Sequence, residues 1–204
     1  MVGIGRCWDG PRVSLMVAAL ALASTAFTGV AVAAEFSAVI PLAGIAGANG
    51  VRFDGVAGGD NSGYALALIG DVNGDGFDDF AVGARNSDLN GDKSGAAYVV
   101  FGRRSGFPGS LNLALLNGGN GFTIRPESGY DSLGVAIAGG DVNGDGFADV
   151  IVGADHAGPV FGVGAVYVIF GKPTPFAAVV ETSLLNGVTG FRLDGVANTD
   201  FTGS

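Results

Sequence analysis

The stretch Asp71-Val-Asn-Gly-Asp-Gly-Phe-Asp-Asp79 recurs 70 residues later, almost unchanged, as Asp141-Val-Asn-Gly-Asp-Gly-Phe-Ala-Asp149. The similarity extends downstream in the same order. Phe80-Ala-Val-Gly-Ala84 is followed by its counterpart Val150-Ile-Val-Gly-Ala154, and Ala97-Tyr-Val-Val-Phe-Gly102 by Val166-Tyr-Val-Ile-Phe-Gly171. Self-similarity at a nearly fixed offset is the signature of a repeat architecture. The chain is therefore built from units of about 70 residues.

A third unit begins near the end of the sequence. Gly50-Val-Arg-Phe-Asp-Gly55 corresponds to Gly121-Phe-Thr-Ile-Arg-Pro126 and again to Gly190-Phe-Arg-Leu-Asp-Gly195. Asp60-Asn-Ser-Gly63 likewise matches Asp200-Phe-Thr-Gly203, so a third acidic loop would begin after Ser204. We expect residues 35–204 to hold repeats over about 42–112 and 113–182 and a truncated third over 183–204.

Each full repeat offers four short apolar or alternating runs separated by Gly-rich or Asp-rich turns, the pattern of short β-strands. Four strands per repeat are typical of a β-propeller blade, so the predicted fold is all-β, a partial propeller. The runs around Val82 and Val152 are too short and too continuous for helices, and their Gly and Ala residues would let neighbouring sheets approach closely. In the first repeat the expected strands are Tyr64 to Gly70, Asp79 to Ala84, Ala96 to Phe101 and Phe122 to Arg125.

The composition agrees with this fold class. The 204 residues include 38 Gly, 48% are hydrophobic, and no Gly-x-y period is present, which excludes collagen and disorder. Many glycines in an acidic, Pro-poor chain indicate numerous turns with positive φ angles.

The N-terminus has the features of a secretory signal peptide over residues 1–34. Arg6 and Arg12 precede an Ala-, Leu- and Val-rich run from Val13 to Ala34 that closes on Ala31-Val-Ala33. The alternative is a single transmembrane anchor, because the run is long enough to span a bilayer. We expect cleavage after Ala33 or Ala34, no membrane insertion after cleavage, and secretion to the cell surface, the extracellular space or a periplasm.

Cleavage would leave 8 basic and 18 acidic residues, a balance that disfavours nucleic acid as a partner. It would also remove Cys7, the one cysteine of the sequence. The exported domain would then have no disulfide, so bound cations are the expected source of additional stability.

The two acidic loops are candidate metal sites. A hard divalent cation takes about six to eight oxygen ligands, and acidic or amide residues at alternate positions supply them. Three carboxylates per loop, with no His or Cys, favour Ca²⁺ over transition metals. The predicted ligands are three carboxylates, one amide and one main-chain carbonyl in each loop: Asp71, Asn73, Asp75, Phe77 (carbonyl) and Asp79, then Asp141, Asn143, Asp145, Phe147 (carbonyl) and Asp149.

Other kinds of loop share parts of this pattern. An Asx-rich hairpin turn without metal would use the same residue types, but its carboxylates would repel one another. EF-hand and dockerin-type loops need an acidic residue at position 12, where this chain has Val82 and Val152. We therefore expect two Ca²⁺ sites, each in a loop between two strands.

No catalytic arrangement stands out in the sequence. His156 is the single histidine, and Gly-x-Ser-x-Gly and His-Glu-x-x-His motifs are absent. The segment Asp88-Leu-Asn-Gly-Asp92 imitates half of an acidic loop, but Ala96 stands at its ninth position, so we interpret it as a turn. The expected protein is not an enzyme.

The chain resembles the FG-GAP repeats of the integrin α-subunit β-propeller and their bacterial relatives. Phe101-Gly102 and Phe170-Gly171 match the Phe-Gly element, while Gly83-Ala84-Arg85 and Gly153-Ala154-Asp155 match Gly-Ala-Pro with the proline replaced. The resemblance implies a closed ring of seven blades with Ca²⁺ in the hairpin loops and ligands on the opposite face. This chain supplies only about 2.4 blades.

Two consequences follow from the resemblance. Further blades, in the same chain or in other copies, would complete the ring, and the strand around Val51 to Asp54 would complete the last blade. The implied function is a non-catalytic, calcium-binding module for cell adhesion or for recognition of an extracellular protein or carbohydrate. The alternative is an accessory propeller of a larger exported enzyme, such as a phospholipase or another hydrolase.

Overall fold

The structure is a computed structural model that describes residues 14–17, 42–45, 47, 50–158, 162–173 and 175–204. Most of the predicted leader therefore lies outside the described residues, and its cleavage stays a prediction.

The first complete blade is an antiparallel sheet of four strands in chain order, which confirms the four strands expected from the sequence. Its strands are β3 (Ser62–Gly70), β4 (Asp79–Ala84), β5 (Ala97–Val100) and β7 (Gly121–Arg125).

The second blade repeats this arrangement with the same strand order. Both blades carry a register irregularity near the start of the first strand, between Ser62 and Leu66 and between Leu133 and Ile137. The strands of the second blade are β8 (Leu133–Gly140), β9 (Asp149–Ala154), β10 (Ala165–Ile169) and β12 (Gly190–Asp194).

Short elements that the sequence analysis did not anticipate lie between the third and fourth strands of each repeat. They are β6 (Ser110–Asn112) with the 3-10 helix η2 (Leu113–Leu115), and β11 (Val179–Glu181) with η3 (Thr182–Leu184). A further 3-10 turn, η1, covers Leu42–Gly44. In the first full blade, β11 pairs in parallel with β7 at the outer edge of the sheet.

The strand β2 (Val51–Asp54) lies in a separate sheet and pairs in parallel with β6, as β7 pairs with β11. This equivalence places β2 as the outer strand of a preceding blade, in line with the role expected from the sequence. On its other side β2 pairs antiparallel with β1 (Ser14–Val17), a strand from the predicted leader. Closure of a ring at this strand stays a prediction.

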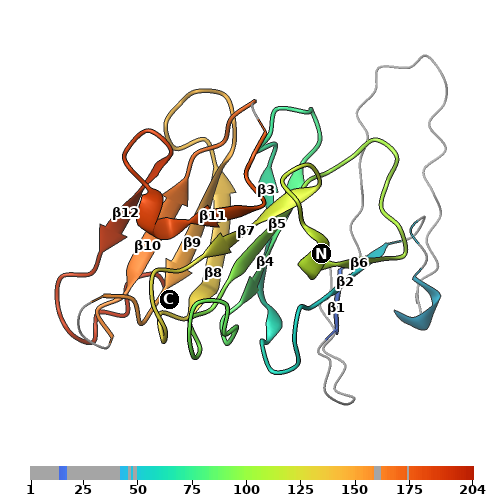
Figure 1. The fold of residues 1–204 in the computed structure, drawn as a ribbon. Helices are drawn as coiled ribbons and strands as arrows, with labels where there is room; N and C mark the ends of the chain where they lie inside the picture. Colours follow the sequence, from blue (N-terminus) through green and yellow to red (C-terminus); the bar gives the residue numbers. More distant parts are fainter. Residues whose placement is uncertain (1–13, 18–41, 46, 48–49, 159–161, 174) are drawn as a thin grey trace.

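The blades stack face to face, and the first blade lies between the sheet of β2 on one side and the second blade on the other (Figure 1). One core cluster joins Ala81 and Val99 of the first blade to Val150 and Val152 of the second. Another packs Val51 and Phe53 of β2 against Val82 and related residues of the first blade. The hydrophobic effect thus acts between blades.

The Gly-Ala dipeptides permit this close stacking, as predicted. A Cβ atom on Gly83 would lie 2.0 Å from the carbonyl oxygen of Gly134, and one on Gly153 would lie 1.8 Å from that of Gly203. Any side chain at these positions would push the next blade away. Gly203 lies in the segment expected to begin a third repeat, and this segment packs on the second blade.

Candidate metal-binding loops

The two acidic segments lie where the sequence analysis placed them, between the first and second strands of each blade. Residues 71–78 connect β3 to β4, and residues 141–148 connect β8 to β9. Because the blades share one strand order, both loops lie at the same end of the stack (Figure 1).

The first loop is folded by hydrogen bonds from its own backbone. Asp71 Oδ1 accepts from the N–H groups of Gly74 and Asp75, at 2.8 and 3.1 Å, and Asp71 Oδ2 accepts from Gly76 at 2.8 Å. Asp75 Oδ1 accepts from the Phe77 N–H at 2.9 Å. Positive φ angles of 75° at Gly74 and 85° at Gly76 make this tight path possible without steric strain.

Asn73 completes the network of the first loop. Its Oδ1 accepts from the Asp75 N–H at 3.0 Å, and its Nδ2 donates to Asp75 Oδ2 at 3.0 Å. Three of the four side chains predicted to bind a cation are therefore gathered around one turn of backbone.

Asp79, the last predicted ligand, is fully buried at the start of β4. Its two oxygens accept from the N–H of Val72 at 2.9 Å and of Gly102 at 2.7 Å. Burial raises the pKa of Asp79 to about 7, the two backbone hydrogen bonds oppose the rise, and the charges of Asp75 and Asp71 add to it. The carboxylates of this loop therefore interact with one another.

The second loop reproduces these contacts. Asp141 accepts from Gly144, Asp145 and Gly146, and Asp145 accepts from Phe147, at distances of 2.7 to 3.1 Å. Asn143 again bridges to Asp145 in both directions. The buried Asp149 accepts from the N–H groups of Val142 and Gly171 at 2.8 and 2.9 Å.

The Phe-Gly element acquires a role that sequence reasoning missed. The glycine N–H of each element, at Gly102 and Gly171, donates to the last aspartate of the loop. A Cβ atom on Gly102 would lie 2.4 Å from the Asp78 carbonyl oxygen, which excludes larger residues. The sequence signal for this role was that the acidic loop and the Phe-Gly element recur together in each repeat, but their contact is made only in the folded blade.

Whether the loops suit a cation can be tested on their donor chemistry. Each offers three carboxylates, an amide and a main-chain carbonyl, an all-oxygen set of the kind that Ca²⁺ prefers. Within the described residues, however, no group of three or more His, Cys, Asp or Glu side chains is arranged to hold a metal ion. The carboxylates are turned toward backbone N–H groups instead. The donor set therefore fits Ca²⁺ chemically, while coordination stays a prediction.

The other singled-out residues lie in loops away from the acidic hairpins. Asp88 accepts from the Lys93 N–H at 2.8 Å and Asp92 from the Tyr130 hydroxyl at 2.5 Å, as expected of a turn. His156 Nδ1 lies 2.7 Å from Asp155 Oδ1, and its ring packs edge-on against Phe201.

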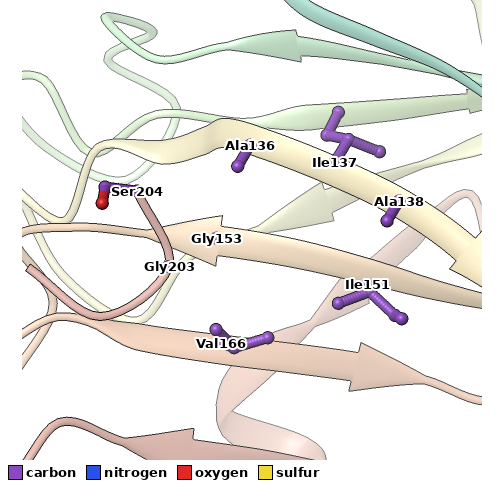
Figure 2. A pocket seen from close by; sticks show the side chains of 8 residues that line it. All are labelled: Ala136, Ile137, Ala138, Ile151, Gly153, Val166, Gly203 and Ser204. Atoms are coloured by element: carbon purple, nitrogen blue, oxygen red, sulfur yellow. The ribbon is translucent and has the colours of Figure 1, made fainter.

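One face of the second blade is open. Figure 2 shows a shallow hollow over β8, β9 and β10, lined by Ala136, Ala138, Ile151 and Val166 together with Gly203 and Ser204. In the first blade the corresponding residues, Ala81 for Ile151 and Ala97 for Val166, are completely buried against the second blade. The open face is therefore equivalent to the face with which the first blade packs on the second, and Gly203 and Ser204 lie at its edge.

A search of the described residues for a helix long and apolar enough to span a bilayer finds none.

Comparison with known proteins agrees with this architecture. Residues 62–100 and 133–169 match the family model of the FG-GAP repeat, and each match runs from the first strand of a blade through its third. Each also contains one acidic loop.

Curated relatives include integrin alpha-6 of Gallus gallus, 34% identical over 123 residues, which are 59% of this chain and 10% of that protein. Integrin alpha pat-2 of Caenorhabditis briggsae is 34% identical over 129 residues, which are 61% of this chain and 10% of that protein. Integrin alpha-PS2 of Drosophila melanogaster is 34% identical over 161 residues, which are 70% of this chain and 11% of that protein. The matched part spans about a tenth of the length of these relatives. The chain contains two FG-GAP repeats and is similar to integrin alpha subunits.

Proposed function

We propose that the protein is a calcium-binding β-propeller module with a non-catalytic role in adhesion or in recognition of an extracellular protein or carbohydrate. The observation that carries the proposal is the duplication of one loop, with the same oxygen donors and the same hydrogen bonds, in two blades. The similarity to integrin alpha subunits supports the adhesion or recognition role.

The role of the cation is structural. Asp71, Asn73, Asp75, Asp79 and the Phe77 carbonyl would hold one Ca²⁺, and the equivalent residues of the second loop another. Bound Ca²⁺ would neutralise the carboxylates gathered in each hairpin. Since the folded loop gathers the donors and the unfolded chain does not, the cation would stabilise the fold by mass action.

The test is thermal unfolding of the protein in a chelator and in millimolar Ca²⁺. We expect Ca²⁺ at about 100 times its Kd to stabilise each site by about 2.7 kcal/mol. The double variant Asp71→Ala with Asp141→Ala should lose this dependence. Asp78→Ala is the matched control, because Asp78 lies in the first loop outside the donor set, and it should keep the dependence. A melting temperature of the unaltered protein that ignores Ca²⁺ would refute the proposal.

We further propose that residues 1–34 direct export and are removed, and that additional blades cover the open face of the second blade. The basic start, the apolar run and the small residues before the cleavage site support export. The apolar residues that line the open face support the additional blades. N-terminal sequencing of the exported protein would test the first proposal.

A further inference from the structure

The two acidic loops are joined directly across the blade interface. The main-chain carbonyl of Asp71, the first predicted ligand of loop one (residues 71–79), accepts from the Ala148 N–H of loop two (residues 141–149) at 3.0 Å. The next carbonyl, that of Val72, accepts from the Lys172 N–H at 2.9 Å. The second blade thereby fixes the backbone at the start of loop one.

The side chains of loop two reach loop one as well. A Cβ atom on Gly74 would lie 2.6 Å from Cε1 of the Phe147 ring, so that ring packs directly on the turn of loop one. A Cβ atom on Gly70 would lie 2.9 Å from Cβ of Ala148. Gly74 is the residue whose N–H binds Asp71 Oδ1. The ring of Phe147 therefore covers the backbone that shapes the first site.

The contact runs in one direction along the stack. Among the described residues, nothing lies within 4 Å of a Cβ atom placed on Gly140 or Gly144, the loop-two counterparts of Gly70 and Gly74. Each loop is thus built to receive the loop of the following blade. Among the described residues, loop one is contacted by the loop of the following blade, and loop two is not.

Phe147 belongs to both sites. Its carbonyl is a predicted ligand of loop two, its N–H donates to Asp145 at 2.9 Å, and its ring lies on loop one. An ordered loop two would hold the ring in place, whereas a loop two distorted by carboxylate repulsion would move it. Two sites that share one residue are energetically coupled if that residue has one arrangement when loop two is filled and others when it is empty.

We infer that Phe147 is a positioning residue for the cation of loop one, and that Ca²⁺ in loop two raises the affinity of loop one. This inference rests on the proposed Ca²⁺ binding and assigns its regulation to the blade interface. Coupling of this kind is reciprocal, so Ca²⁺ in loop one raises the affinity of loop two by the same factor.

Calorimetric titration of the whole protein with Ca²⁺ alone tests the inference. The affinity of loop one is measured in the unaltered protein and in the variant Asp141→Ala with Asp145→Ala, which removes two donors of loop two and keeps Phe147. We expect a loss of at least about fivefold in loop-one affinity, the lower end of typical coupling. Phe147→Ala should cause a similar loss while both sites still bind.

Two further variants separate positioning from general stability. Asp78→Ala is the control, since Asp78 lies in loop one but outside the predicted donor set of either loop. It should leave the coupling intact. Phe147→Tyr keeps the ring and should restore it. The stability of each variant in chelator is measured in parallel, because a merely structural role would lower it without changing the ratio of the two affinities.

The outcomes are distinct. If loop one binds Ca²⁺ equally well whether or not loop two can bind it, the coupling is wrong and the proposed function stands. If the unaltered protein binds no Ca²⁺, the proposed function is wrong and the coupling falls with it.

Discussion

Asp79 and Asp149 each tie three parts of a blade together. Each is the first residue of the second strand, and each accepts from the loop before it and from the Phe-Gly element after the third strand. A buried carboxylate that lost such partners would carry a desolvation penalty. The last aspartate of the loop therefore has a structural role in addition to its predicted contact with Ca²⁺.

The glycines of the Phe-Gly elements are the first residue-scale prediction. Gly102→Ala should destabilise the fold by about 1–3 kcal/mol, because the new Cβ would lie 2.4 Å from the Asp78 carbonyl oxygen. Gly140→Ala is the control, since nothing lies within 4 Å of its Cβ among the described residues. Denaturant midpoints measure both. Equal midpoints for the two variants would contradict the assigned role of Gly102.

The second residue-scale prediction concerns pH. Because the pKa of Asp79 is raised from 3.8 to about 7, the folded state binds more protons than the unfolded state between these values. In chelator the free energy of unfolding should therefore fall as pH rises from about 4 to about 7. Asp79→Asn should flatten this slope. Asp60 and Asp131, whose pKa values burial also raises, remain in both proteins, so the difference in slope reports Asp79. Parallel slopes would contradict the prediction.

At the scale of the element, the acidic hairpin is a turn that folds on itself and then packs on its neighbour. Its Gly residues supply positive φ angles, and its Asp and Asn residues bind the backbone. The short strands β6 and β11, in contrast, depend on contacts with another strand. They are held at the blade edge by parallel pairing, and β11 also by Arg125, whose guanidinium lies 2.6 Å from Glu181.

Limited proteolysis gives the prediction for this element. Chymotrypsin cleaves after aromatic residues, and we expect Ca²⁺ to protect the loops at Phe77 and Phe147 by stiffening both hairpins. Tyr130, 56% exposed on the β7–β8 loop, is the internal control and should be cut at the same rate with or without Ca²⁺. Cleavage at both phenylalanines that is insensitive to Ca²⁺ would speak against metal in the hairpins.

At the scale of the whole molecule, stability resides between blades. Ala81 and Ala97 are completely buried in one interface, while their counterparts Ile151 and Val166 line an open face. An apolar face of this kind indicates a missing partner.

We therefore expect the native particle to be heavier than the 20.2 kDa of this chain. Light scattering of the natural protein measures its mass, and denaturing mass spectrometry then distinguishes a longer chain from several copies. A native particle of 20 kDa or less, with the open face uncovered, would contradict this expectation.

A charge placed on the open face tests the same point. Ile151→Asp should destabilise or dissociate the native particle, because the carboxylate would be buried by the next blade. In a protein limited to these 204 residues the same change should have little effect. Ala81→Asp, at the equivalent covered position, should be severely destabilising in both. If Ile151→Asp leaves the native particle unchanged, no blade covers this face.

The sequence by itself determined the blades and the loops. Repetition of the acidic segment, the short apolar runs and the Phe-Gly elements predicted four strands per repeat, and in the first repeat the predicted ends lie within two residues of the observed ones. These features are local, because turn chemistry and strand alternation act over a few residues.

What only the tertiary structure decided lies between segments distant in the chain. The Gly102 N–H donates to Asp79, the Phe147 ring packs on Gly74, and Gly134 packs against Gly83. The parallel pairing of β6 and β11 with the outer strand of the preceding blade was also not predictable, since an edge strand of three residues has no pattern of its own. The contacts of Phe147 with Gly74 and of Gly134 with Gly83 depend on how the blades stack, and a periodic sequence specifies each unit more directly than the register between units.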